Sequence, residues 1–182
     1  MKKGLYKCIQ WSVVIVFAYL LFFPIFIKID KVIPAVEVSL GDLSFCEPLN
    51  VIIEGTYHWR LIGDDTFDGN IKFDIYPLTM KDILAQGKGL PTLRFQDGID
   101  HLDYGEWMDS ESFGKIHTKA FFNKFIVQIY GNGEGNGIDG ARGWSTIDGH
   151  CIVAPAHNKE EALSILKRIQ NDDLAPYEYW IE

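Results

Sequence analysis

The chain has 182 residues, of which 47% are hydrophobic and 14% aromatic, and its formal net charge is −8. This length predicts one domain plus an appendage, and the hydrophobic content is sufficient for a packed core, which argues against a disordered chain. Residues 1–29 carry four lysines and no acidic residue, so residues 30–182 carry 13 basic and all 25 acidic side chains, a net charge of −12. An acidic domain repels phosphate backbones, which argues against nucleic acid as a partner.

The first predicted element is a transmembrane helix. Residues 8–27 contain no charged side chain, and 20 helical residues span roughly 30 Å, the thickness of the hydrocarbon core of a bilayer. A cleaved signal peptide is the alternative, but its apolar region is usually shorter and ends in small residues, whereas Ile33 stands at the −3 position of the nearest candidate cleavage site. The sequence therefore predicts an anchor over residues 1–29 that contacts the lipid bilayer through residues 8–27.

The charges that flank this segment predict its orientation. Lys2, Lys3 and Lys7 precede the apolar run, whereas Lys28 and Lys31 follow it and are partly offset by an acidic residue between them. Because the more basic flank stays in the cytoplasm, we expect a single-pass protein of the cell membrane with a cytoplasmic N-terminus. Residues 30–182 then form a domain outside the cytoplasm.

Most of this outer domain is predicted to be strands. Apolar side chains alternate with polar ones along Val36–Leu40, Val51–Leu61 and Ile71–Ile75, which is typical of a sheet with one buried face. The segments Gly63–Asp65 and Asp68–Gly69 have the composition of hairpin turns. Further strands are expected over Leu93–Phe95, Ile116–Tyr130 and His150–Ala154.

Two helices are predicted within this domain. The first runs from Thr79 to Gln86, where Thr79 and Asp82 resemble a capping box. The second runs from Asn158 to Gln170, with Asn158 as its N-cap and with the apolar stripe Ala162, Ile165, Leu166 and Ile169. The expected fold is mainly β, an antiparallel β-sandwich or open barrel with a C-terminal α-helix, preceded by one transmembrane helix.

The stretch EGTYHWRLIGDDTFDGNIKFDIYPLT, together with the anchor, resembles small single-pass membrane-anchored bacterial proteins of unassigned function. The resemblance covers about a quarter of the chain. It implies a β domain outside the cytoplasm, and it brings no catalytic residue with it.

The acidic run after residue 96 is the candidate metal site. Asp97, Asp100, Asp103 and Glu106 recur every third residue, with two further acids by residue 111 and no basic side chain between them. Hard carboxylate oxygens are the ligands that Ca²⁺ prefers, so these four residues are the candidate calcium ligands. A solvated acidic surface is the simpler interpretation of such a run.

Other motifs carry less weight. Gly135–Gly140 matches G-x-G-x-x-G and also imitates the start of a calcium-binding loop, but no helix follows it and the last carboxylate ligand is missing. A Cys151–His157 pair has the residue types of a nucleophile and its base, yet no third member is evident. The sequence therefore predicts no catalytic residue and no organic cofactor.

Cys46 and Cys151 are the two cysteines of the outer domain and form a candidate disulfide, because an oxidising compartment permits one. The alternative is two buried thiols. We expect their pairing only if the fold brings the two Cα atoms within about 7 Å of each other.

The leading function hypothesis is a non-catalytic domain that binds a protein, a peptide or a cell-wall component next to the membrane. Its candidate binding residues are aromatic side chains without an evident place in the core: Trp107, Trp144, Tyr177, Tyr179 and Trp180. One alternative is a membrane-tethered hydrolase that gathers acids and a histidine in one cleft, such as Asp65, Asp103 and His117. Another is a regulatory or immunity-type subunit of a membrane complex, although the anchor lacks a G-x-x-x-G motif.

Overall fold

The computed structural model describes residues 2–42, 44–81, 83–85, 92–106, 109–130 and 149–173. In this part of the chain, eight antiparallel strands form one sheet in the order β4-β3-β2-β1-β8-β7-β6-β5. The strands are β1 (Ile25–Ser39), β2 (Cys46–Trp59), β3 (Asp65–Phe73), β4 (Leu93–Phe95), β5 (Ile99–Glu106), β6 (Asp109–Thr118), β7 (Phe125–Ile129) and β8 (His150–Ala154).

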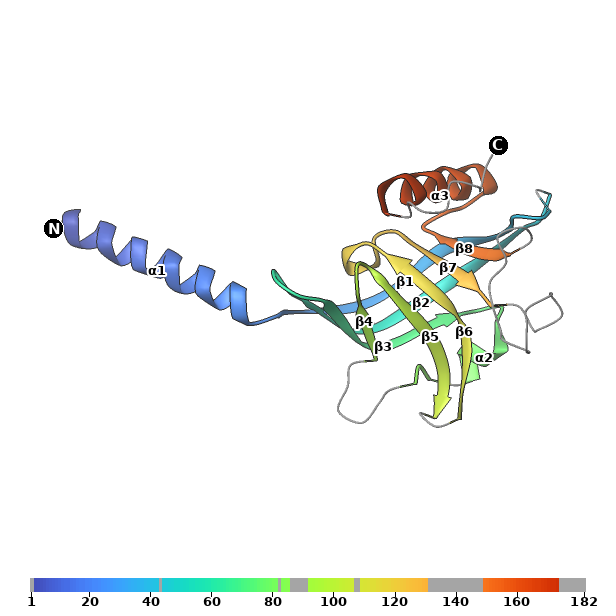
Figure 1. Cartoon of the computed structure of the whole chain (residues 1–182), viewed down its shortest axis with the longest axis horizontal. Helices are drawn as coiled ribbons and strands as arrows, with labels where there is room; N and C mark the ends of the chain where they lie inside the picture. The colour runs from blue at the N-terminus through green and yellow to red at the C-terminus, as the bar shows by residue number, and fades with distance from the viewer. Residues whose placement is uncertain are drawn as a thin grey trace.

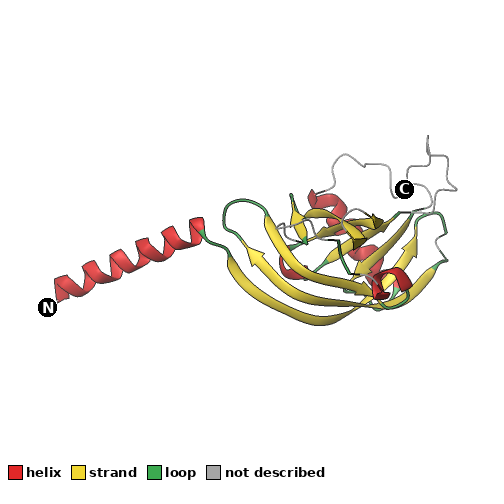
Figure 2. Cartoon of the chain, turned by 90° about the horizontal axis from the view of Figure 1, so that it is seen from below, coloured by secondary structure: helices red, strands yellow, loops and turns green. Residues whose placement is uncertain are grey.

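The sheet curls into a nearly closed up-and-down barrel (Figures 1 and 2). Nearly all neighbours in the barrel are neighbours in sequence, and the exception is the pairing of β1 with β8, from Val36 opposite Val153 to Ser39 opposite His150. The two end strands of the sheet, β4 and β5, lie next to each other and pair at an isolated bridge between Gln96 and Ile99. The prediction of a mainly β fold with a C-terminal helix is thus confirmed, as a barrel rather than a sandwich.

The turn between β4 and β5 shows how the acidic run after residue 96 begins as a tight hairpin turn. Asp97 and Gly98 both have positive φ, 52° and 80°, which is the backbone of a type I′ turn. Asp-Gly is a favoured pair for that turn because both residues tolerate this conformation. Most of the acidic run therefore lies in β5 and at the start of β6, two strands that the sequence analysis did not predict.

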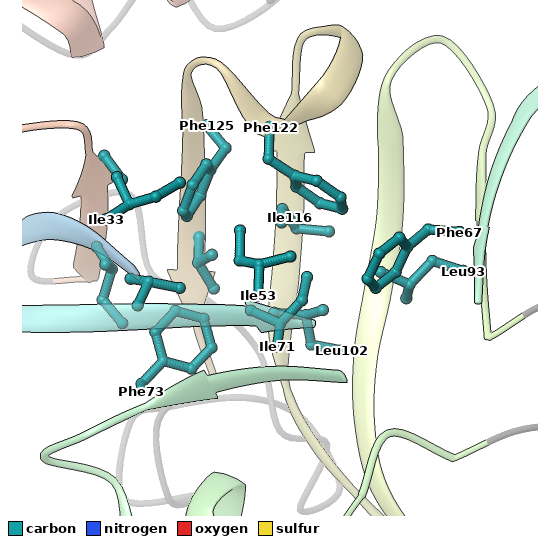
Figure 3. Packing of buried hydrophobic residues seen from close by; sticks show 14 of the residues in the cluster. Ile33, Ile53, Phe67, Ile71, Phe73, Leu93, Leu102, Ile116, Phe122 and Phe125 are labelled. Carbon is teal, nitrogen blue, oxygen red and sulfur yellow. The ribbon is translucent and has the colours of Figure 1, made fainter. Parts of the chain in front are cut away.

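The barrel interior is filled by apolar side chains (Figure 3). Alternate residues such as Val51, Ile53 and Tyr57 of β2 point inward, as the period of two predicts. Gly55 and Gly69 lie opposite each other on β2 and β3, where a Cβ on either would approach the Phe67 ring to 2.7 Å. The two glycines thus make room for an aromatic ring inside the barrel.

Helix α3 (Lys159–Asp173) packs on the outside of β1 and β8. Asn158 Oδ1 accepts a hydrogen bond from the Glu161 backbone amide at 2.9 Å, so the predicted N-cap is confirmed. Ala162 and Leu166 are buried against Val36 and Val38 of β1. As a result β1 is buried on both faces over Ala35–Ser39, and the predicted wet face of Val36–Leu40 is wrong.

Two other predicted elements differ from the structure. The helix predicted over Thr79–Gln86 is instead the short α2 (Pro77–Lys81), and Thr79 is buried and bonds the carbonyls of Phe73 and Tyr76 rather than capping a helix. The single strand predicted over Ile116–Tyr130 is the end of β6 and all of β7, joined by the 3₁₀ turn η1 (Ala120–Phe122). Leu93–Phe95 and His150–Ala154 are confirmed as β4 and β8.

Helix α1 (Lys2–Phe22) extends away from the barrel (Figures 1 and 2). It ends before Pro24, which cannot continue the helical hydrogen bonding, and β1 begins at Ile25. The 20-residue helix predicted over residues 8–27 is therefore too long, because its last residues pair with β2, beginning with Ile25 opposite Trp59. Among the described residues, no helix meets the combined criteria of length and hydropathy for crossing a membrane.

Candidate functional site

A buried carboxylate marks the end of the barrel that lies farthest from α1. Glu37 stands on the same face of β1 as Ile33 and Ala35, which belong to the barrel core, and its side chain is only 5% exposed. A strand rises about 3.3 Å per residue, so Glu37 lies roughly 40 Å along β1 from Ile25. A charge in such a place requires hydrogen-bond partners.

Two side chains from other elements supply them. The Tyr76 hydroxyl, in the turn after β3, donates to Glu37 Oε2 at 2.6 Å. The His150 Nδ1 atom, at the start of β8, lies 2.5 Å from Glu37 Oε1. Burial, and then the bond to Glu37, raise the pKa of Tyr76 far above its usual value, so this phenol stays a neutral donor.

Glu37 holds the imidazole ring of His150 in a fixed orientation. A carboxylate that accepts the Nδ1 proton fixes the tautomer and the orientation of the imidazole ring. The His150 side chain is 42% exposed, and its ring meets Phe45 edge-on at a centroid separation of 4.9 Å. The arrangement could therefore hold or move a proton at the barrel end, or recognise a polar group there.

This cluster was not predicted from the sequence. The alternating pattern placed Glu37 on the polar face of a half-exposed strand, and His150 was expected only as the start of a strand. The signal in the sequence is that Glu37 follows a run of apolar residues, Val32–Val36, and precedes Val38. Apolar residues therefore occupy both faces of the strand on which Glu37 lies. Such a run is typical of a strand that is covered on both sides.

A second polar cluster lies on the outer face of β5, β6 and β7. His117 is buried, and its Nε2 lies 3.1 Å from Gln128 Oε1. The hydroxyl of Tyr130 lies 3.0 Å from His101 Nδ1. Burial is the main cause that lowers the pKa of His117 below its ordinary value, with smaller contributions from Lys115 and His101, whereas the bond to Gln128 opposes the shift.

Three of the candidate calcium ligands lie along β5, and Asp97 lies in the turn before it. A spacing of three residues on a strand places successive side chains on opposite faces, so Asp103 faces away from the side of Asp100 and Glu106. Asp100 instead accepts hydrogen bonds from the backbone amides of Arg94 and His101. In the described part of the chain, no three His, Cys, Asp or Glu side chains gather as they would to hold a metal ion.

The three residues suggested for a hydrolase have separate partners. Asp65 accepts a hydrogen bond from the Tyr57 hydroxyl at 2.8 Å, whereas His117 faces Gln128. The charge of Asp103 acts on Tyr130. Asp103 and His117 thus both lie near the His101–Tyr130 pair, whereas Asp65 is bonded to Tyr57.

The register of β1 separates the two outer cysteines. Val38 lies opposite Cys46 on one side and opposite Cys151 on the other, so β1 runs between them. Two strand spacings amount to about 10 Å, beyond the roughly 7 Å that a disulfide can bridge. A Cys46–Cys151 disulfide does not fit this barrel, and Cys46 is exposed while Cys151 is buried.

Several predicted residues lie outside the described residues. They are the candidate binding aromatics Trp107, Trp144, Tyr177, Tyr179 and Trp180 and the glycine-rich segment Gly135–Gly140. Of the Cys151–His157 pair, Cys151 is in β8, and the exposed His157 precedes α3, where its backbone amide donates to Glu161. No protein-family model, curated protein or solved structure matches this chain.

Proposed function

We propose that this protein is a membrane-anchored binding domain, with the barrel outside the cytoplasm and without catalytic activity. The observation that carries the proposal is the exposure of apolar side chains around α1. Five consecutive residues, Val13–Phe17, are exposed, and five residues exceed one helical turn, so every side of the helix is apolar there. A helix that is hydrophobic all round requires an apolar environment, which a bilayer supplies.

The rest of the chain supports this arrangement. The lysines at positions 2, 3 and 7 precede the apolar part of α1, which favours a cytoplasmic N-terminus. The aromatic and aliphatic side chains that pack inside the barrel leave its outer surface and its far end for recognition. The partner we propose is a protein, a peptide or a cell-wall component that reaches the barrel from the side opposite the membrane.

Membrane fractionation of the full chain tests the anchor. We expect the protein to stay in the membrane pellet after an alkaline carbonate wash, and the double variant Val14→Glu/Phe17→Glu to move to the supernatant. Each acidic side chain near the centre of a span costs about 2.5–3.5 kcal/mol on insertion scales. The control Ile83→Glu makes the same change at an exposed apolar residue beyond α2 and should leave the protein in the pellet. A full chain that washes off the membrane would contradict the anchor.

Protease protection tests the orientation. A protease added to intact spheroplasts should digest the barrel and leave the N-terminal end of α1 protected, because the basic flank precedes the apolar part of the helix. Full protection of the barrel, together with digestion after lysis, would show the reverse orientation.

The Glu37–His150 pair favours a second candidate, a membrane-tethered hydrolase in which His150 is the general base. That function predicts hydrolysis of a chromogenic ester such as p-nitrophenyl acetate at a rate that His150→Ala abolishes and Glu37→Gln lowers. Equal rates for the three proteins, at the level of a buffer blank, would leave the binding function as the better description.

A further inference from the structure

A second apolar surface lies beside the end of α1. The hairpin turn between β2 and β3, residues 60–64, exposes Leu61 and Ile62, and Ile62 is 67% exposed. Because Trp59 lies opposite Ile25, residues 60–63 extend past the start of β1 toward the last turn of α1. Both views of the chain show the tip of this hairpin next to that turn (Figures 1 and 2).

The surface is larger than the turn alone. Phe23, Ile25 and Phe26 are also exposed, and the Phe26 ring packs edge-on against His58 of β2 at a centroid separation of 4.8 Å. We call these five exposed side chains the hairpin-tip surface: Phe23, Ile25, Phe26, Leu61 and Ile62. They form a continuation of the apolar surface of α1 onto the barrel.

The charges around the hairpin-tip surface fit a lipid surface. The acidic side chains of the chain begin at Asp30 on β1, and none lies between Gly55 and Gly63 of the β2–β3 hairpin. Lys28 and Arg60, both exposed, flank the surface, while Asp64, two residues after Ile62, is paired with Arg94 at an Nε–Oδ2 distance of 3.0 Å. Basic side chains that flank exposed aromatic and aliphatic residues are typical of the interfacial zone of a bilayer, where their charges meet lipid headgroups.

The length of α1 gives the reason for a second contact. Its uncharged part, Cys8–Phe22, has 15 residues and rises about 22 Å, less than the roughly 30 Å of a hydrocarbon core. A helix this short brings the barrel close to the headgroups, because the bilayer thins or the flanking residues enter the interface.

We propose that the hairpin-tip surface inserts into the headgroup region of the same membrane that holds α1, and thereby fixes the barrel in one orientation. This inference rests on the proposed membrane anchor. It assigns two contacts to the protein, one spanning and one interfacial, and it keeps the Glu37 end of β1 directed away from the lipid.

Environment-sensitive fluorescence on the full chain tests the inference. Ile62→Cys is labelled with the fluorophore NBD in a background that carries Cys8→Ser and Cys46→Ser, and the chain is reconstituted into vesicles of phosphatidylcholine and phosphatidylglycerol. The matched control is Ile83→Cys, since Ile83 is also an exposed isoleucine, at 63%, and it follows α2, where its carbonyl oxygen accepts a hydrogen bond from the Gly105 amide near the end of β5. Background labelling of the buried Cys151 is measured in the chain without an added cysteine.

We expect the label at position 62 to emit at a shorter wavelength than the label at position 83, and to lose intensity when the lipids carry a shallow doxyl quencher. Equal, water-like emission at both positions in protein that floats with the vesicles would overturn the inference and leave the anchor intact. A blue shift at position 62 that the doxyl lipids do not quench would mean that protein, such as a second copy, covers the surface, which also overturns it. Protein that fails to float with the vesicles would overturn the anchor itself.

Discussion

The carboxylate of Glu37 joins three segments that are far apart in the chain. It accepts from Tyr76 in the turn after β3 and faces His150 at the start of β8, while Glu37 itself belongs to β1. Loss of the carboxylate removes the acceptor of the half-buried Tyr76 hydroxyl and one partner of the His150 ring. The cost of leaving such a hydroxyl without its acceptor exceeds the value of the bond itself.

We expect Glu37→Ala to lower the free energy of unfolding by about 1–3 kcal/mol. Urea denaturation followed by tryptophan fluorescence measures the change. The matched control is Glu47→Ala, because Glu47 lies directly opposite Glu37 on β2 but is exposed, and it should cost less than about 0.5 kcal/mol. Equal losses in the two variants would show that the bonds of Glu37 contribute nothing beyond those of a surface acid.

His117 makes the stability of the barrel depend on pH. Burial lowers its pKa in the folded state, with Lys115 and His101 adding to the shift and Gln128 opposing it. The unfolded chain therefore takes up a proton near pH 6.5, while the folded chain does so only at lower pH. Its contribution to stability is present above that value and is lost as pH falls toward the folded pKa.

The urea midpoint should therefore fall more steeply between about pH 7.5 and about pH 5.5 in the native chain than in His117→Gln, which keeps a polar side chain that cannot titrate. His157→Gln is the control, because it makes the same change at an exposed histidine. Parallel pH profiles for the native chain and His117→Gln would contradict the prediction.

At the scale of elements, the β2–β3 hairpin depends on its facing glycines. A Cβ at Gly55 would lie 2.4 Å from the Asp68 carbonyl oxygen and 2.7 Å from the Phe67 ring. The backbone cannot yield without breaking the ladder, so overpacking of this kind costs about 1–3 kcal/mol. We expect this loss for Gly55→Ala and for Gly69→Ala, measured by thermal unfolding.

A second substitution separates a clash with the Phe67 ring from the general effect of replacing glycine by alanine in a strand. Gly55→Ala combined with Phe67→Leu removes the ring edge that the new methyl group meets, so the double variant should lose less than the sum of the two single variants. Additive losses would mean that the Phe67 ring is not what excludes a side chain at position 55.

The elements that the sequence predicted are those with one buried face. Val51, Ile53 and Tyr57 alternate with polar residues because only one side of β2 meets the core, and β2 and β3 were recognisable for that reason. β5 was missed because its inward residues Leu102 and Tyr104 stand among acids that suggested a solvated loop. The amphipathic pattern and the N-cap of α3 are local, so that helix was predictable too.

The candidate site was not predictable from local patterns. Glu37 meets His150 because β1 pairs with β8, and a pairing between residues more than 100 positions apart leaves no periodic signal in the sequence. The burial of Glu37 follows from its place on the inward face of β1 with Ile33 and Ala35, and only the closed barrel makes that face an interior. The end of α1 at Phe22 reflects the pairing of Ile25 with β2, which apolar composition alone does not reveal.

For the whole molecule, the seam between β4 and β5 is the weakest part of the barrel. β1 is hydrogen-bonded to β2 and also to β8 over Val36–Ser39, whereas β4 has three residues and pairs in register only with β3. Local opening requires less free energy where a strand has a partner on one side only.

Native-state hydrogen exchange should therefore show the fastest strand amides in β4 and the slowest in the part of β1 that lies between β2 and β8. Mass spectrometry of peptic fragments resolves the two segments. Uniform protection across all eight strands would mean that the barrel opens only by global unfolding.

The pairing of β1 with β8 also means that the barrel cannot close until the ribosome has synthesised β8. The first strand leaves the ribosome with one edge satisfied by β2, and its other edge waits for residues 150–153. At translation rates of about 5–20 residues per second, that wait is on the order of 10 s. During this interval the nascent chain carries an unpaired strand edge that can pair with other chains. We therefore expect folding to benefit from a chaperone or a tether that keeps neighbouring copies apart until β8 has been synthesised.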